Sequence, residues 1–206
     1  FRIVLRAPLE ARAATGARLR LTPLRQDTPT LVAQWPGALI NGAVSIELQG
    51  GGGPSVGLLL DRVHWAPSQP FEADGTLSLS DWRASGASIS ASELRADMLV
   101  SPEGVGRIGL RGPARITGPV GDGEVRDLVA DLNLAVDWSE GWRVSPADAC
   151  LPVRFSGLEV AGLAFSDGAF GLCAQGGALI ASDANERLSG GFVIRELGLA
   201  GRMAGP

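Results

Sequence analysis

The stretch Leu128–Trp138 reads LVADLNLAVDW, and it decides the fold class. Apolar residues occupy every second position of this stretch, while Asp131, Asn133 and Asp137 fall between them. Adjacent residues of a β-strand face opposite sides, so the pattern predicts a strand with one apolar and one polar face. We expect Asp131, Asn133 and Asp137 to point away from the apolar side chains.

The same alternation with a period of two recurs along the chain. Shorter runs of this kind lie at residues 17–22, 44–49, 76–80 and 107–111. Neighbouring strands that place their apolar residues on the same side of a sheet form one surface, so we expect a continuous apolar lining. Its predicted residues are Leu77, Leu79, Ile108, Leu110, Leu128, Leu132, Leu134 and Val136.

Clusters of turn-forming residues separate the alternating runs. They lie at residues 50–54, 67–70, 101–104, 118–123 and 139–141, and they are rich in glycine, proline and serine. Most gaps between the runs are too short for the helical crossover that joins parallel strands. The sequence therefore predicts an all-β fold of many short antiparallel strands.

Two segments are compatible with a helix. Residues 90–93 have the spacing of a capping box, and Leu94 and Met98 lie four positions apart. The same segment also alternates through Val100, and we favour a strand there. Residues 9–14 could form one helical turn before Gly16.

The alternation alone leaves two architectures open. An ordinary β-sandwich buries the apolar faces of two sheets against each other. A long curved sheet, shaped like a taco, instead lines a groove with its one apolar face. Aromatic residues make up only 5% of the chain, so few large side chains are present to fill a closed core. A β-solenoid is a further alternative.

The composition excludes several classes of function. The chain has 206 residues, of which 45% are hydrophobic and 19% charged, so it can bury a core. All its basic residues are arginine, which excludes lysine-dependent P-loop and Schiff-base chemistry. His64 is the one histidine, which argues against a multi-histidine metal site in this chain. The net charge of −4 does not favour nucleic acid as a partner.

We expect no enzymatic activity, cofactor or metal. His64 lies three residues after Asp61, but the chain has no Gly-x-Ser-x-Gly nucleophile motif. We interpret His64 as a residue at a strand end beside Trp65. The glycine run 50–53 is interpreted as a flexible turn, since no lysine follows it.

The sequence opens at Phe1 within an alternating pattern and ends at Gly205–Pro206. We therefore interpret residues 1–206 as one continuous segment excised from a larger protein. No apolar run approaches the roughly 18 residues of a membrane-spanning helix. An anchor or signal peptide would lie in the parent chain.

Residues 149–180 read ACLPVRFSGLEVAGLAFSDGAFGLCAQGGALI. This segment resembles the YdbH-type proteins, relatives of the AsmA and TamB families of diderm bacteria. The resemblance rests on two cysteines, Cys150 and Cys173, that flank a Gly-Leu strand, the second within Leu-Cys before a glycine-rich turn. Ala174 stands where the family often has proline.

The resemblance implies a bridge-like protein of the periplasm that is anchored in the inner membrane. Such proteins form a long taco-shaped sheet with a hydrophobic groove, which is implicated in moving phospholipids between the inner and outer membranes. The implied partners are phospholipid acyl chains and a small outer-membrane lipoprotein that extends the sheet by strand addition. A structural or adhesive β-module of the cell envelope is the alternative function.

Two further groups of residues are candidates for specific roles. In the oxidising periplasm that the resemblance implies, Cys150 and Cys173 would form a disulfide, whereas in the cytosol they would be two unpaired buried thiols. The tryptophans near the ends of alternating runs either plug the edges of the sheet or lie at the level of lipid headgroups. These are Trp65, Trp82, Trp138 and Trp142.

Overall fold

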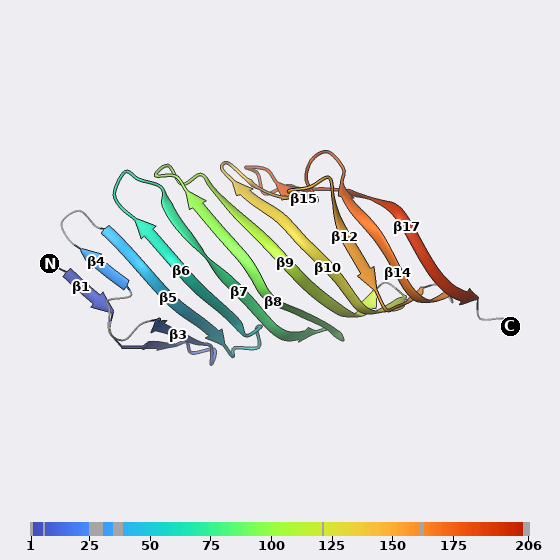
Figure 1. The fold of residues 1–206 in the computed structure, drawn as a ribbon, viewed down its shortest axis with the longest axis horizontal. Coiled ribbons are helices and arrows are strands. Elements are labelled where there is room, and N and C mark those ends of the chain that lie inside the picture. The colour runs from blue at the N-terminus through green and yellow to red at the C-terminus, as the bar shows by residue number, and fades with distance from the viewer. Residues whose placement is uncertain are drawn as a thin grey trace.

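The computed structural model describes residues 2–5, 7–24, 31–34, 39–120, 122–160 and 163–203. All regular secondary structure in these ranges is β, and it forms one sheet of seventeen strands (Figure 1). The all-β prediction is therefore confirmed. The strands are β1 (Arg2–Leu5), β2 (Leu9–Arg12), β3 (Arg18–Pro23), β4 (Leu31–Gln34), β5 (Leu39–Gln49), β6 (Val56–Trp65), β7 (Phe71–Ala84), β8 (Ala87–Val100), β9 (Gly106–Val120), β10 (Gly123–Trp138), β11 (Trp142–Pro146), β12 (Cys150–Phe155), β13 (Gly157–Val160), β14 (Leu163–Ala174), β15 (Ile180–Ser182), β16 (Leu188–Ser189) and β17 (Phe192–Met203).

The centre of the sheet is an antiparallel meander. From β5 to β10, each strand pairs with the strand that precedes it in the sequence, and most of the connections are short turns. These turns fall on the predicted glycine-rich and proline-rich clusters, such as residues 50–55 between β5 and β6. The alternating sequence supplies two-faced strands, and the turns reverse the chain between them.

Shorter strands extend the meander on both sides. At the N-terminal side, β3 and β4 both pair with β5, and they carry β2 and β1 respectively. At the other side, β10 is long enough to pair with β11, β12 and β13 in turn. The sheet continues from β12 and β13 through β14 to β17, and from β11 through β15 to β16.

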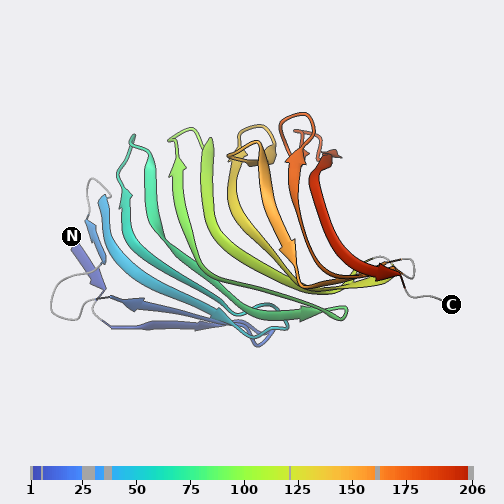
Figure 2. The same cartoon turned by 45° about the vertical axis from the view of Figure 1, so that its right-hand side comes forward.

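The long strands bend along their length, so the sheet is a curved trough rather than a flat layer (Figure 2). Register shifts mark β-bulges at several of these strands, including Leu60/Arg62 in β6, Ala91/Arg95 in β8 and Val125/Leu128 in β10. A bulge adds one unpaired residue to a strand, which bends it and increases its twist. The bulges therefore account for part of the curvature.

The two segments that were compatible with a helix are strands. Residues 90–100 belong to β8, as we favoured, and pair on both sides with β7 and β9. The possible helical turn at residues 9–14 is wrong, because β2 occupies Leu9–Arg12 and pairs with β3. Pairing with a neighbouring strand overrides the weak helical preference of a four-residue segment.

The described residues form a single layer. All seventeen strands belong to the same sheet, so within the described ranges no second sheet or helix covers either face. The β-sandwich alternative is therefore not what the structure shows. The curved antiparallel sheet is the architecture of this chain.

Candidate functional site: an apolar trough

The register of the sheet places all eight predicted lining residues on one face. Leu134 and Val136 in β10 lie directly opposite Leu110 and Ile108 in β9. In β8, Ala96 and Met98 pair with these two β9 residues, while Leu94 and Ala91 face Leu77 and Leu79 in β7. Directly paired residues of neighbouring strands share a face, so the set forms one surface.

The surface extends well beyond the predicted residues. One ladder of directly opposed side chains crosses six strands from β2 to β8 without a polar member. Its residues are Leu9, Leu21, Ile46, Leu58, Leu77 and Leu94. The ladder shows that β2, β3 and strands β5 to β8 contribute to the same apolar lining.

The lining also continues on the other side of β10. Val153 in β12 pairs with Ala130 in β10 on one side and with Phe170 in β14 on the other. In the next positions, Leu151 pairs with Leu172, which pairs in turn with Ile194 in β17. The trough therefore runs across the strands from β2 to β17. Ten inter-strand steps of about 4.8 Å make it roughly 48 Å long.

Sequence reasoning missed the contribution of β8. Leu94, Ala96 and Met98 lie between the predicted β7 and β9 residues and join them into one surface. The signal was present, because these residues alternate with Arg95 and Asp97. The competing capping-box pattern at residues 90–93 left the segment ambiguous.

The apolar face carries no charge along its central part. In the described strands β6 to β10, every paired position of this face holds an apolar residue or a glycine. A buried charge without a partner costs several kcal/mol, so an uncharged path is what an apolar ligand requires.

The apolar face is the concave side of the trough. In a single-layer sheet, a side chain is covered only by neighbours on its own face, and curvature toward that face crowds them together. The chain's most buried apolar residues are mostly on this face, with exposures of 7% or less. They include Val44, Val63, Ala73, Ala91, Leu94, Val125, Leu151, Val153 and Phe155. The predicted lining residues themselves are half-buried, so a ligand in the trough can reach them.

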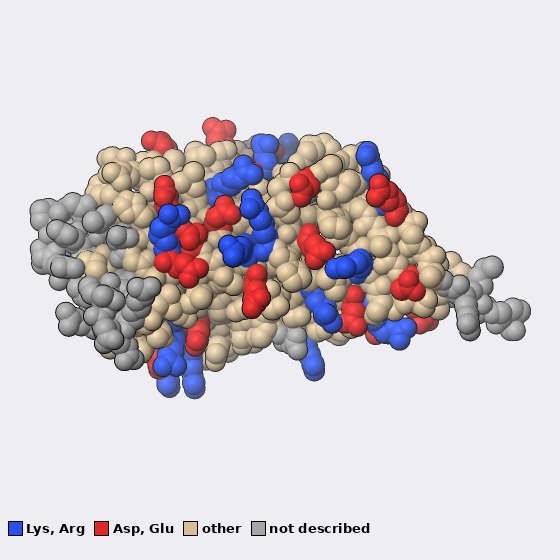
Figure 3. Space-filling model, in the orientation of Figure 1, with Lys and Arg blue, Asp and Glu red and all other residues tan. Residues whose placement is uncertain are grey.

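The opposite face is polar, as the alternation predicted. Asp131 and Asp137 pair there with Arg154 at 3.2 Å and with Arg107 at 3.7 Å. Asn133 accepts a hydrogen bond from Arg111 at 3.3 Å and donates one to Asp148 at 2.6 Å. Figure 3 shows arginine and acidic side chains spread over this side of the molecule. Such exposed ion pairs contribute little to stability but keep this face in water.

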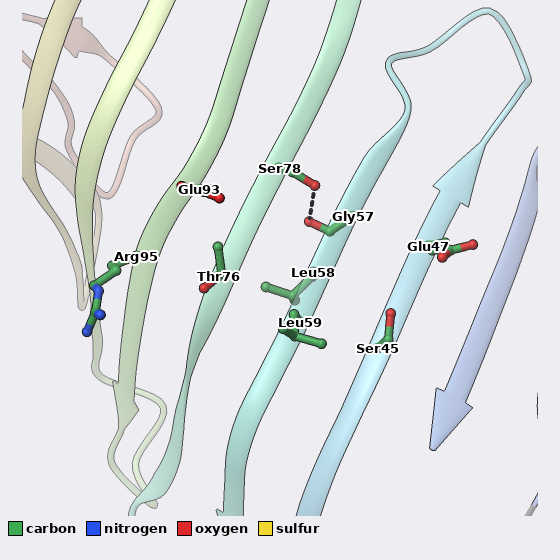
Figure 4. Close-up of a pocket in the computed structure, with 9 residues that line it drawn as sticks. All are labelled: Ser45, Glu47, Gly57, Leu58, Leu59, Thr76, Ser78, Glu93 and Arg95. Atoms are coloured by element: carbon green, nitrogen blue, oxygen red, sulfur yellow. Dashed lines mark hydrogen bonds between the residues drawn. The ribbon is translucent and has the colours of Figure 1, made fainter. Parts of the chain in front are cut away.

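A shallow hollow of about 610 Å³ lies on the polar face above β5 to β8 (Figure 4). Gly57 leaves a gap there, and Ser78 donates its hydroxyl hydrogen to the Gly57 carbonyl at 3.3 Å. The surrounding side chains include Ser45, Glu47, Thr76 and Arg95. Leu58 and Leu59 also line the hollow, but most of its side chains are polar and solvated, so it is poorly suited to an apolar ligand.

His64 lies near the end of β6, as predicted. Its Nε2 atom is 3.2 Å from the side-chain oxygen of Gln69. No cluster of three or more His, Cys, Asp or Glu side chains that could hold a metal ion occurs within the described ranges.

Cys150 and Cys173 form a disulfide, as predicted. They are directly opposed residues of β12 and β14, and their Cα atoms are 4.0 Å apart. The bond ties β14 to β12 next to the point at which the chain leaves β14 for β15. It therefore fastens two adjacent strands in the C-terminal part of the trough.

The described residues include no helix that is long and apolar enough to cross a membrane. Comparison with family models, with curated proteins and with solved structures finds no match for this chain.

Proposed function

We propose that this chain is a segment of a periplasmic bridge-like protein whose apolar trough conducts phospholipids between the inner and outer membranes. The observation that carries the proposal is the uncharged, concave face that continues from strand to strand. The trough binds acyl chains, and the polar face keeps the protein hydrated.

The energetics of lipid transfer favour such a surface. Moving an acyl chain of about 16 carbons out of a bilayer costs roughly 13 kcal/mol, at ~0.8 kcal/mol per methylene. A carrier must offset this cost at every point along the path. A continuous apolar lining does so without a specific pocket.

The location rests on the disulfide and on the resemblance of residues 149–180. Disulfides persist in oxidising compartments such as the periplasm and are rare in the cytosol, so Cys150–Cys173 is compatible with an extracytoplasmic protein. The periplasm and an inner-membrane anchor in the parent chain follow from the resemblance and are part of the proposal.

The edge of the sheet supports a protein partner. Within the described ranges β17 pairs only with β14, and Phe192, Ile194 and Leu197 are 59%, 47% and 55% exposed. An edge of this kind can accept a further strand, whether from the parent chain or from another protein. We propose that a small outer-membrane lipoprotein extends the sheet by strand addition.

An adhesive or structural module has no comparable need for an uncharged concave face.

The direct test compares one charge on the two faces of β10. Leu134→Asp places a carboxylate in the trough, whereas Asn133→Asp places the same group one residue away on the polar face, in water and between Arg111 and Asp148. We expect the Leu134→Asp protein to remain folded, since water reaches the open trough, and to lose photo-crosslinking to a phospholipid that carries a diazirine on its acyl chain. Asn133→Asp should crosslink as the wild type does.

Circular dichroism establishes whether each variant is folded. A folded Leu134→Asp protein that crosslinks at the wild-type level would contradict the proposal. If the variant unfolds, native mass spectrometry of the wild-type protein decides the question, and a protein that retains no phospholipid from its host would contradict the proposal equally.

A further inference from the structure

The indole ring of Trp138 lies across the neighbouring strand rather than standing up into the trough. Trp138 ends β10, and its directly opposed partner in β9 is Gly106. A Cβ atom on Gly106 would overlap three atoms of the ring, Cζ2, Cε2 and Cη2. The ring therefore fills the space in which a side chain of β9 would lie. On its other side, Trp142 of β11 is directly opposed to Trp138, so a second indole occupies that direction.

A second aromatic residue of the trough has the same arrangement. Phe155 in β12 is directly opposed to Gly168 in β14. A Cβ atom on Gly168 would overlap Cζ of the phenyl ring and lie 2.7 Å from Cε1. Phe155 is 5% exposed, which places it among the most buried residues of this face. Two large side chains of the lining thus rest on glycines of the adjacent strand.

The backbone does not itself require glycine at these two positions. Neither Gly106 nor Gly168 has a positive φ angle, so an L-residue fits the conformation of the chain at both. What a side chain would meet there is the aromatic ring. At Gly106 the three nearest atoms all belong to Trp138, whereas at Gly168 the backbone oxygen of Gly198 is also close, at 3.0 Å. Gly106 is therefore the cleaner position for a test.

The glycines determine how much of the trough is open. Two sheets that pack face to face lie about 10 Å apart, so one layer of upright side chains is about 5 Å deep. A ring that crosses to the next strand at the height of a Cβ atom takes up less of this depth than an upright ring does. Glycine permits the crossing because it has no Cβ atom.

An alanine at position 106 would move the ring rather than the strands. The overlapping atoms are at the far end of one side chain, which can rotate about χ1 and χ2 to another staggered conformation. A hollow of about 1170 Å³ borders both Gly106 and Trp138, so a displaced ring has free space to enter. The displaced ring would then stand above the wall of the trough.

We propose that Gly106 and Gly168 are positioning residues of the lipid path, which hold Trp138 and Phe155 against the wall and keep the trough wide enough for phospholipids with two acyl chains. This inference rests on the proposed function. A side chain on either glycine turns the ring into the path. The narrowed path excludes a phospholipid with two acyl chains more than a lysophospholipid, which has one.

Nuclear magnetic resonance on the unaltered chain tests the position of the rings. We expect nuclear Overhauser contacts between the indole protons of Trp138 and the Hα protons of Gly106, and between the phenyl protons of Phe155 and those of Gly168. Both contacts should persist when diheptanoylphosphatidylcholine is added, because the rings stay on the wall while lipid occupies the trough. Loss of these contacts on addition of the lipid would overturn the proposal.

Photo-crosslinking tests the consequence for the path. The probes are phosphatidylcholine and lysophosphatidylcholine, each with a diazirine on an acyl chain. Gly106→Ala should lose most of its crosslinking to phosphatidylcholine and retain more of that to lysophosphatidylcholine. Adding Trp138→Ala to this variant should restore crosslinking to phosphatidylcholine, since the displaced ring is then absent.

Gly109→Ala is the matched control in the same strand. A Cβ atom there would lie 2.5 Å and 2.7 Å from the carboxylate oxygens of Asp97, an overlap of the same kind on the polar face. This variant should crosslink both lipids as the wild type does, even if its stability falls. A loss equal to that of Gly106→Ala would show a general effect on the sheet and would overturn the proposal.

The remaining outcomes separate this role from the proposed function. A folded Gly106→Ala protein that crosslinks phosphatidylcholine at the wild-type level, or a loss that Trp138→Ala does not reverse, would overturn the positioning role. If circular dichroism shows that Gly106→Ala is unfolded, the ring contacts of the lipid-bound wild-type protein decide the question. A wild-type protein that crosslinks neither lipid would instead contradict the proposed function.

Discussion

Acidic residues occupy several positions at which the long strands break register. Glu93, Asp127 and Glu196 have φ angles of 59°, 47° and 55°, and they lie at the bulges of β8, β10 and β17. An L-residue in this left-handed conformation costs roughly 1–2 kcal/mol. Asp127 is held there by hydrogen bonds from Arg115 and Ser156.

Glu93→Gly should stabilise the protein, because glycine adopts positive φ without a steric cost. We expect the unfolding free energy to rise by about 0.5–1 kcal/mol, as measured by urea denaturation. Glu93→Val should lower it, since a β-branched residue fits this conformation poorly. Glu124→Gly is the control at a regularly paired position of β10. It should lower the unfolding free energy, because glycine weakens a regular strand. A Glu93→Gly protein less stable than Glu93→Val would refute the bulge argument.

Removing the disulfide should weaken the C-terminal part of the trough. The two cysteines are separated by 23 positions, and the chain-entropy relation assigns such a loop about 3 kcal/mol. We expect Cys150→Ser/Cys173→Ser to lower the unfolding free energy by about this amount. Reduction of the wild-type protein with dithiothreitol should reproduce the loss, and an unchanged denaturation midpoint in both cases would contradict the expectation.

At the scale of elements, local pattern predicted the strands but not their joint architecture. Residues 128–138 form an uninterrupted part of β10 because nothing in that run competes with the alternation. A β-sandwich and a trough both need strands with one apolar face, so alternation could not distinguish them. The bulges were not predicted from the sequence. A bulge forms where one strand has an extra residue relative to the strand that pairs with it, and the sequence of a single strand does not reveal this.

Close approach of β6 and β7 depends on Gly75. A Cβ atom at this position would overlap the backbone carbonyl of Leu59, which belongs to the neighbouring strand. Gly75→Ala should therefore push the two strands apart and cost about 1–3 kcal/mol, as overpacking commonly does. Gly52→Ala is the control, because a Cβ atom at position 52 would meet no atom within 4 Å. Gly52 has a φ of +76°, so the alanine there adds some backbone strain but no overlap.

Hydrogen exchange measures the consequence of Gly75→Ala directly. Amide protons of β6 and β7 should exchange faster in the variant, while those of β12 and β14 should keep their wild-type rates, because they lie on the other side of β10. Uniform acceleration over the whole sheet would show that the strands do not respond separately.

At the scale of the whole molecule, a single layer leaves a large apolar surface accessible to solvent. Large exposed apolar patches normally mark interaction surfaces. The native protein should therefore bind the dye ANS in the absence of lipid, and phospholipid should displace the dye. Leu134→Asp should reduce the dye fluorescence, whereas Asn133→Asp should leave it unchanged. Lack of ANS binding by the folded wild-type protein would contradict an open trough.

The meander also determines how a protein of this kind can change its length. Because strands β6 to β9 pair only with their neighbours in sequence, inserting or deleting a whole hairpin among them alters two junctions and leaves every other pair intact. Each hairpin adds about 9.6 Å, or two strand spacings, to the span. Stability then accumulates from nearest-neighbour terms, as in repeat proteins, so the length of the trough can be adjusted in modular steps during evolution.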